Sequence, residues 1–387
     1  MKLASRMSLL GTETAFEVLA RAKGLEAAGQ SIIFLGIGEP DFDTPEHIIN
    51  GAKSALDAGY TRYTPSPGLP IVRECIAADM SARQGYDIAP SNVIITPGAK
   101  PIMFYTILAL CEEGDEAIYP NPGFPIYESM IRFSGATPIP MPLVESQAYN
   151  PDPSELEHLF STKTKLVIIN SPNNPCGSVI PDSTLQIIAD LAKKNDAIVL
   201  SDEIYKDFYF EGSHTSITNF PDMSSRSIIL DGLSKSYAMT GWRVGYGIFP
   251  DELVEPITRL ITNSVSHTPA FTQMAIIDAL SSSQESVANM VAEFKIRRDV
   301  LVDGLNKLPG ISCPMPLGAF YAFPNINGTG LSSRTFEQRL LNEAGVSLIS
   351  GTSFGEYGEG YVRISFANSM ENIEEALRRM AAFLANL

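Results

Sequence analysis

Residues 228–243 read Ile-Ile-Leu-Asp-Gly-Leu-Ser-Lys-Ser-Tyr-Ala-Met-Thr-Gly-Trp-Arg. An apolar, strand-like run ends shortly before Lys235, and Arg243 follows past a Thr-Gly pair. A lysine at the end of a buried strand is desolvated, which lowers its pKa and favours the neutral amine that attacks carbonyls. A neighbouring arginine is suited to a phosphate. The stretch therefore suggests a lysine that forms a Schiff base with pyridoxal phosphate (PLP); the alternative is a surface lysine after a core strand.

Four earlier strand-like runs also end in unusual residues. They are residues 93–96 before 97–101, 116–119 before 120–124, 166–169 before 170–177, and 197–200 before 201–205. Up to about residue 250 such strands alternate with helical stretches, which predicts a parallel sheet wrapped by helices. Open sheets of this class bind ligands at the carboxyl ends of their strands. The five strand ends together predict a binding site.

The chain of 387 residues is long enough for two domains. We expect an extended arm over residues 1–12 and a large PLP-binding domain over 46–285. Residues 13–45 and 286–387 are expected to form a smaller α+β domain. Its predicted helices cover 13–28, 286–308 and 370–384, and a strand is predicted over 31–38.

Composition excludes several classes of protein. The net charge of −16 repels nucleic acid and anionic membranes. No apolar run is long enough to span a membrane, and the first residues lack the apolar core of a signal peptide, so we expect a cytoplasmic protein. The four cysteines have no CxxC spacing and read as reduced thiols. The four scattered histidines give no metal-binding motif, so no metal site is predicted.

Glycines mark two of the candidate binding segments. Gly98, Ala99 and Lys100 stand where a strand passes into a helix, and the N–H groups and dipole of such a junction attract phosphate. The dipole contributes roughly 0.3–2 kcal/mol, so a phosphate dianion also needs Arg243. A plain helix-starting turn is the alternative. Gly38 follows Gly36 without the third glycine of a dinucleotide fingerprint, and is read as either a tight turn or backbone near a substrate carboxylate.

The remaining candidates are polar or aromatic residues near strand ends. Asp202 could keep a pyridine nitrogen protonated, and Tyr205 could reach the phenolic oxygen of the ring; a solvated acidic loop is the alternative. Asn174 could donate to the same oxygen or merely form an Asn-Pro turn. Phe124 could stack on the ring or fill the core. Arg363 lies in an apolar run and needs a fixed anion, either a substrate α-carboxylate or a structural aspartate.

As an ordered set, these motifs resemble class I/II aminotransferases, PLP enzymes of fold type I, over almost the whole chain. The matching segments are residues 36–45, Tyr63 with Gly68 and Arg73, and residues 98–100, 171–177, 201–205, 234–246, 318–321 and 362–366. The resemblance implies a large domain with a mostly parallel seven-stranded sheet wrapped by helices, and a smaller α+β domain. It also implies a homodimer with shared active sites, in which Tyr63 reaches the phosphate of the neighbouring subunit.

The resemblance also implies a role for each site residue. Lys235 forms the aldimine with PLP, and Asp202 pairs with the pyridinium. Phosphate is held by Arg243 with the amides of Ala99 and Lys100 beside Gly98. The ring contacts are Asn174, Tyr205 and Phe124. The substrate α-carboxylate is held by Arg363, Gly38 and Asn174.

Two positions depart from the family pattern. Gly232 replaces a phosphate-binding serine, for which Ser234 could compensate. Cys176 replaces a threonine, with a modest local effect expected.

The implied activity is a ping-pong transfer of an amino group from an L-amino acid to a 2-oxo acid, with 2-oxoglutarate as acceptor. Lys100 matches a lysine that meets the side-chain carboxylate in aspartate-using members, so an aspartate-like donor is favoured. Glu17 aligns with their threonine and could disfavour an acidic substrate. Aromatic or broad neutral donors are the alternative, and so is a PLP β-lyase on the same fold.

Overall fold

The structure is a computed structural model that describes residues 3–387. Its centre is a seven-stranded sheet in which β8 alone runs antiparallel to its neighbours, β2 and β7. In spatial order the strands are β2 (Val93–Thr96), β8 (Gly245–Ile248), β7 (Ser227–Gly232), β6 (Ile198–Asp202), β5 (Thr164–Asn170), β3 (Glu116–Asn121) and β4 (Thr137–Pro142). The prediction of a mostly parallel seven-stranded sheet is confirmed.

Helices bury both faces of this sheet. The strands are apolar on both sides, and successive residues such as Ile228 and Ile229 lie in different cores. This is the pattern that a sheet covered on both faces requires. One face packs against α4 (Lys100–Leu110), α5 (Ile126–Ser134) and α8 (Asp251–Ser264). The other packs against α2 (Glu46–Asp57), α3 (Pro70–Gln84), α7 (Asp182–Lys194) and α9 (Ala270–Ser281). A single-turn helix, α6 (Leu156–Leu159), lies near α7 and β4.

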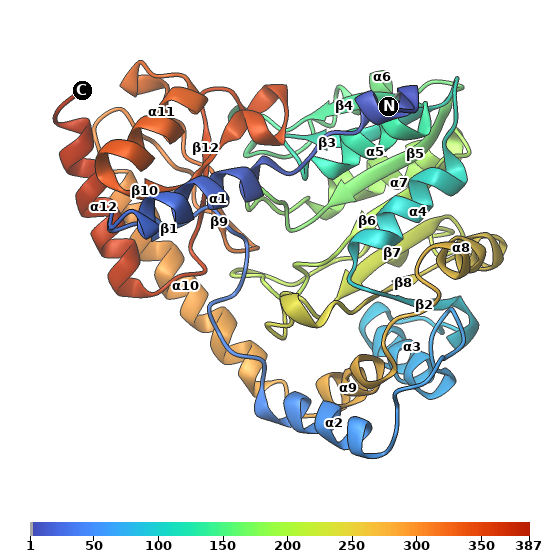
Figure 1. The fold of residues 1–387 in the computed structure, drawn as a ribbon. Coiled ribbons are helices and arrows are strands. Elements are labelled where there is room, and N and C mark those ends of the chain that lie inside the picture. The colour runs from blue at the N-terminus through green and yellow to red at the C-terminus, as the bar shows by residue number, and fades with distance from the viewer. Residues whose placement is uncertain (1–2) are drawn as a thin grey trace.

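A second group of elements lies at one end of the sheet (Figure 1). Two short sheets form here. One pairs β1 (Ile33–Phe34) with β10 (Val346–Ser347), and the other orders β11 (Ile349–Ser350), β12 (Val362–Ser365) and β9 (Tyr321–Ala322). The surrounding helices are α1 (Thr14–Ala27), α10 (Glu285–Leu305), α11 (Ser333–Arg339) and α12 (Met370–Leu384). The N-terminal and C-terminal parts of the chain therefore meet in space.

Some elements differ from the sequence-based prediction. The strand expected over residues 31–38 shortens to β1, because its partner β10 is equally short. The strand β4 was not predicted, since it carries prolines at alternate positions, Pro138, Pro140 and Pro142. It lies at the sheet edge and pairs only with β3 there, so a missing N–H is tolerated. The strand β8, which contains two glycines, was likewise missed.

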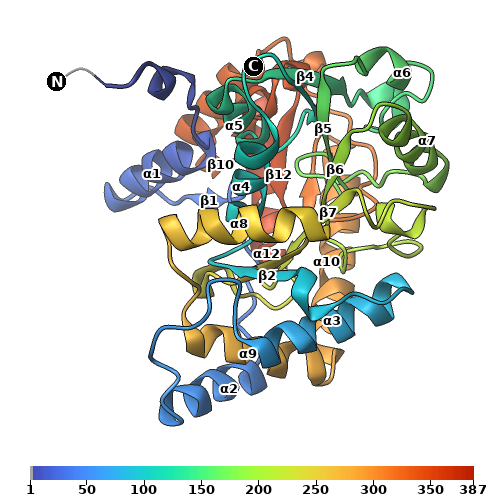
Figure 2. The same ribbon diagram turned by 90° about the vertical axis from the view of Figure 1, so that its right-hand side faces the viewer.

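The N-terminal segment is not fully extended as predicted. Residues Ser5–Leu9 form a short 3-10 helix beside α5, and the Gly11 N–H donates to the Ser129 hydroxyl at 2.8 Å. Figure 2 shows this segment reaching out beyond the rest of the molecule. Within residues 3–387 no helix is both long and apolar enough to cross a membrane.

Candidate active site

A cavity of about 580 Å³ opens at the carboxyl ends of β5, β6 and β7. Its wall also includes the start of α4, part of β12 and the segment that leads into α1. Most of the residues singled out in the sequence line this one cavity. They are Gly38, Ala99, Lys100, Phe124, Asn174, Asp202, Tyr205, Ser234, Lys235, Arg243 and Arg363.

Lys235 projects into the cavity from the loop after β7. Its amine donates a hydrogen bond to the carbonyl oxygen of Gly38 at 2.5 Å. Burial, together with a smaller effect of the charge of Arg363, lowers the pKa of Lys235 to about 8, against opposing effects of Glu39 and Glu13. The amine is therefore far more often neutral at physiological pH than an ordinary lysine, which makes it a competent nucleophile and base.

Asp202 ends β6 and is buried at the cavity wall. The Tyr127 hydroxyl donates to one carboxylate oxygen at 2.5 Å, and the Ile204 N–H donates to the other at 3.2 Å. Burial raises the pKa of Asp202 to about 6, although these two hydrogen bonds act in the opposite direction. A cationic ligand next to this carboxylate would bring the pKa down again.

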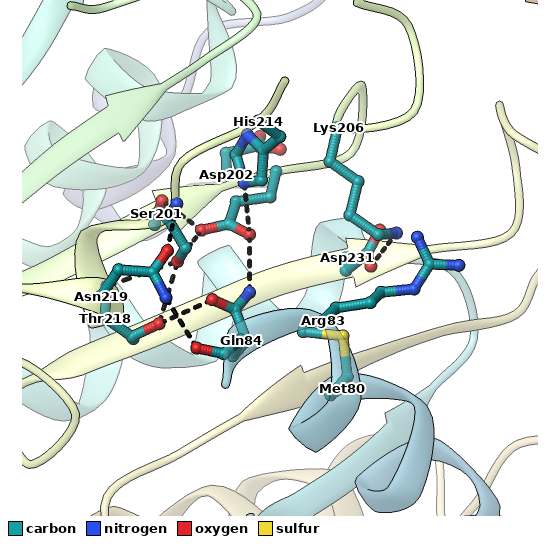
Figure 3. A network of polar contacts seen from close by, with 12 residues as sticks. Met80, Arg83, Gln84, Ser201, Asp202, Lys206, His214, Thr218, Asn219 and Asp231 are labelled. Atoms are coloured by element: carbon teal, nitrogen blue, oxygen red, sulfur yellow. Dashed lines mark hydrogen bonds and ion pairs between the residues drawn. The ribbon is translucent and has the colours of Figure 1, made fainter. Parts of the chain in front are cut away.

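Behind Asp202, a polar network supports the end of β6 (Figure 3). The buried carboxylate of Glu203 accepts hydrogen bonds from Ser201 at 3.0 Å and Ser216 at 2.5 Å, and His214 Nε2 lies 2.9 Å away. Burial alone would raise the pKa of Glu203, but His214 and the hydroxyl donors hold it below its usual value. The strand end that carries Asp202 is thus tied to the loop at 214–216.

Arg363 lies on β12 with its guanidinium in the cavity wall. It donates to the Asn174 side-chain oxygen at 2.9 Å and to the Gly36 carbonyl at 2.5 Å. Its Nε is buried and has no hydrogen-bond partner within residues 3–387. Burial lowers the pKa of Arg363, so water solvates this cation poorly and a bound anion would stabilise it.

Tyr205 makes a contact that the sequence did not reveal. Its hydroxyl lies 2.7 Å from the hydroxyl of Tyr321 on β9. Burial raises the pKa of Tyr205 well above its usual value, so the phenol stays protonated and can donate. A side chain on Gly38 would collide with the same Tyr321 hydroxyl, which explains the glycine.

Arg243 and the start of α4 form a positively charged corner of the cavity. Gly98 has φ +84°, and a side chain there would collide with the Arg243 guanidinium. Gly98 lies against this guanidinium. In the described chain it is not one of the residues that line the cavity. Ala99 precedes α4 as its N-cap, and Lys100 begins the helix. The corner therefore offers a guanidinium and free N–H groups to an anion.

Comparison with known proteins identifies the family. The family model "Aminotransferase class I and II" matches residues 30–380. The chain belongs to the class I and II aminotransferases. It is 40% identical over 381 residues to an aspartate aminotransferase of Pyrococcus horikoshii, covering 98% of this chain and 96% of the relative. It is 38% identical to aromatic-amino-acid aminotransferase 2 of Thermococcus litoralis, covering 99% and 98%.

Solved structures agree with this assignment. The aspartate aminotransferase from Thermus thermophilus with maleate superposes with a TM-score of 0.95 at 34% identity, covering 99% of this chain and all of that one. The chain is thus an amino-acid aminotransferase, and the family implies PLP as cofactor. The residues present fit that group, because a buried carboxylate, a lysine with lowered pKa and an arginine whose guanidinium lies beside the start of α4 all border one cavity. In residues 3–387, no cluster of three His, Cys, Asp or Glu side chains could hold a metal ion.

The two departures of this aminotransferase have local explanations. Gly232 ends β7 beside Gly245, and a Cβ at position 232 would lie 3.0 Å from the Gly245 Cα. The close approach of the two strands therefore favours glycine. Ser234 lines the cavity, which is the position it needs if its hydroxyl is to replace the phosphate-binding serine that is absent at position 232. Cys176 is buried in an apolar cluster, where burial raises the pKa of its thiol well above the usual value.

Glu17 and Tyr63 both lie outside the wall of this cavity in the described chain. Glu17 is exposed on α1 and lies outside the cavity lining of the described residues, whereas Glu13 lines it. The residues of this region that line the cavity are 13–16, so Glu17 is not placed to meet a substrate in it. Tyr63 is 91% exposed, packs edge-on against His267, and is not part of the cavity wall of this single described chain.

Sequence reasoning missed four residues that shape the aminotransferase site: Tyr127, Asn170, Tyr321 and Glu13. Asn170 could have been found, because it is the last residue of a strand at the binding edge; its amide donates to the Asp202 carbonyl at 3.0 Å. Tyr127 follows Phe124 by one helical turn, which is a weak signal. Tyr321 belongs to the matching segment 318–321, but no role was assigned to it, and no local pattern marked Glu13.

Proposed function

We propose that this aminotransferase binds PLP in the cavity through Lys235 and transfers amino groups from an acidic amino acid to 2-oxoglutarate. Asp202 carries the first part of the proposal. Its carboxylate is buried at the cavity wall and accepts hydrogen bonds from neutral donors, Tyr127 and Ile204. A ligand with a protonated ring nitrogen would supply the positive charge that stabilises it.

The other residues would hold the remaining parts of the cofactor. Arg243, the N–H groups of Ala99 and Lys100, and the Ser234 hydroxyl would bind the phosphate beside Gly98. Phe124 would stack on the ring. Asn174 and Tyr205 would bind the ring oxygen, for which the high pKa of Tyr205 keeps its proton available.

When bound, PLP supplies an electron sink for the negative charge left at the substrate Cα after proton loss. The Lys235 amine takes that proton as general base and returns it as general acid. With its pKa lowered to about 8, roughly a tenth of the amine is neutral at pH 7. Arg363, Asn174 and the Gly38 backbone would hold the α-carboxylate and so orient the Cα–H bond toward the amine.

The preference for an acidic donor rests on Lys100, whose amine faces the cavity 5.3 Å from the centre of the Phe124 ring. The second carboxylate of aspartate or 2-oxoglutarate needs such a cation. Several relatives are named aspartate aminotransferases, and the structure of one aspartate aminotransferase was solved with maleate, a dicarboxylic acid. Aromatic donors are the second candidate, supported by the aromatic relative and by Phe16 and Phe124 in the cavity wall.

A half-reaction screen tests the function. The protein loaded with PLP is mixed singly with the twenty amino acids, and conversion to the pyridoxamine form is followed by absorbance. We expect aspartate and glutamate to convert fastest. The absence of conversion with every amino acid would contradict the proposal, and faster conversion by phenylalanine or tyrosine would select the second candidate.

Replacing Arg363 by lysine should weaken amino-acid binding without loss of PLP. Lysine keeps the charge but loses the planar group that contacts Asn174 and Gly36. We expect kcat/KM for the donor to fall roughly 100-fold, equivalent to about 2.7 kcal/mol, chiefly through a higher KM. Steady-state kinetics measures this change, and the absorbance of bound PLP is the control. An unchanged KM would contradict the assigned role.

We also propose a homodimer in which Tyr63 contacts the phosphate of the partner's site. The support is the 91% exposure of Tyr63 and the apolar residues exposed on the N-terminal segment, Leu3, Met7, Leu9 and Leu10. Sedimentation equilibrium should give twice the chain mass of 42.0 kDa. A monomer that retains full activity would contradict the shared site.

We also propose that the chain divides into two domains and an N-terminal arm, and that the protein is cytoplasmic. A large domain over residues 46–285 agrees with the extent of the seven-stranded sheet. A small domain over 13–45 and 286–387, with an arm over 1–12, agrees with the pairing of β1 and β10. The proposed cytoplasmic location is supported by the free cysteines at positions 75, 111, 176 and 313, because thiols stay reduced in that compartment.

A further inference from the structure

Within residues 3–387, four cationic side chains line the cavity: Lys100, Lys235, Arg243 and Arg363. The proposed function assigns Lys235 and Arg243 to the cofactor and Arg363 to the α-carboxylate. Lys100 is therefore the cation that remains for the substrate side chain. Whether the Lys100 amine can bind the carboxylate of an acidic substrate depends on which group already neutralises its charge.

Glu13 forms an ion pair with Lys100. The carboxylate belongs to the residue that precedes α1, and the amine to the first residue of α4, so the pair bridges segments far apart in the chain. The Lys100 side chain is 45% exposed and that of Glu13 only 15%. The negative charge of Glu13 also reaches Lys235 and Arg363, since it raises the pKa of both.

The surroundings of the pair are apolar. Phe124 lies under the Lys100 amine, and Phe16, 60% exposed, follows Glu13 by one helical turn in the cavity wall. With the pair closed, an apolar or aromatic side chain would meet a neutralised ion pair and two phenyl rings. A second carboxylate, in contrast, would be repelled by Glu13 until Lys100 is released from it.

We infer that Glu13 determines how strongly the enzyme discriminates between dicarboxylic and neutral substrates, by competing with the substrate for Lys100. The inference rests on the proposed function of the cavity. Partly exposed ion pairs are weak, so a substrate carboxylate can displace Glu13 at a small cost. The same cavity can therefore accept 2-oxoglutarate in one half-reaction and a neutral or aromatic amino acid in the other. Neither of these two half-reactions requires the protein to change its fold.

Replacing Glu13 by glutamine tests the inference. The PLP-loaded protein is mixed with aspartate and, separately, with phenylalanine, and kcat/KM of each half-reaction is measured by stopped-flow absorbance. We expect the aspartate-to-phenylalanine ratio to rise roughly five- to tenfold, because Lys100 is freed and a like charge is removed. Glu13→Ala should shift the ratio in the same direction, which guards against an effect of the glutamine amide.

A double-mutant cycle identifies Lys100 as the target. Lys100→Gln should lower the ratio, and in that background Glu13→Gln should change it less than about twofold. Glu17→Gln, which removes an exposed carboxylate from the same helix, is the matched control and should leave the ratio unchanged.

An unchanged ratio in both Glu13 variants, including one with equal losses for both donors, would overturn the inference. So would a full Glu13→Gln effect in the Lys100→Gln background. Failure of the wild-type protein to convert any amino acid would instead contradict the proposed function, so the two failures are distinguishable.

Discussion

Lys235→Ala is expected to lower the rate of amino-group transfer by at least about 10 000-fold. The amine is the proposed attachment point of PLP and also the group that moves the substrate proton, and general acid–base catalysis alone contributes up to about 10 000-fold. The wild-type protein treated with borohydride should retain a pyridoxyl group on a peptide that contains Lys235, as mass spectrometry would show. The variant should retain none.

Two further variants separate chemistry from charge. Lys235→Arg keeps a positive charge but does not deprotonate at neutral pH, so it should be as inactive as the alanine variant. Lys53→Ala removes an exposed lysine from α2 and should keep full activity. Turnover by Lys235→Ala near the wild-type rate would exclude the proposed mechanism.

Asp202→Asn should lower kcat by roughly 100- to 1000-fold while leaving the fold intact. The neutral amide has a similar size but cannot stabilise a protonated ring nitrogen, and preorganised charges of this kind contribute about that much to catalysis. Tyr127→Phe removes a hydrogen bond from the same carboxylate and should have a smaller effect. Both are measured as kcat with the best donor. An Asp202→Asn enzyme within a few-fold of wild type would contradict the role.

The same substitution should stabilise the protein when no PLP is bound. Burial raises the pKa of Asp202 from 3.8 to about 6, so the folded state holds this proton more tightly than the unfolded state. The associated stability is present below about pH 4 and is lost as the pH rises through about 6. At pH 8 the asparagine variant should therefore be more stable to urea by about 1–3 kcal/mol, with the difference vanishing near pH 4. A less stable variant at pH 8 would contradict this account of Asp202.

Much of the site could be predicted from the sequence because parallel strands deliver their carboxyl ends to one edge. Once residues 166–169, 197–200 and 228–230 were read as strands of one parallel sheet, Asp202 and Lys235 were expected at the same edge of that sheet. The prediction needed only local patterns and the geometry of this class of sheet. It extended to Arg363, because a charged residue inside an apolar strand requires a fixed partner.

The sequence alone thus determined the class of sheet and the residues that each strand delivers to its carboxyl edge, since these follow from short-range periodicity. Only the tertiary structure decided which distant segments complete the cavity. The Glu13 ion pair with Lys100, the Tyr321 hydroxyl beside Tyr205 and the placement of Tyr63 outside the cavity wall depend on how α1, β9 and the loop before α3 pack. Such contacts leave no periodic signal, because each depends on side chains brought together from segments far apart in the chain.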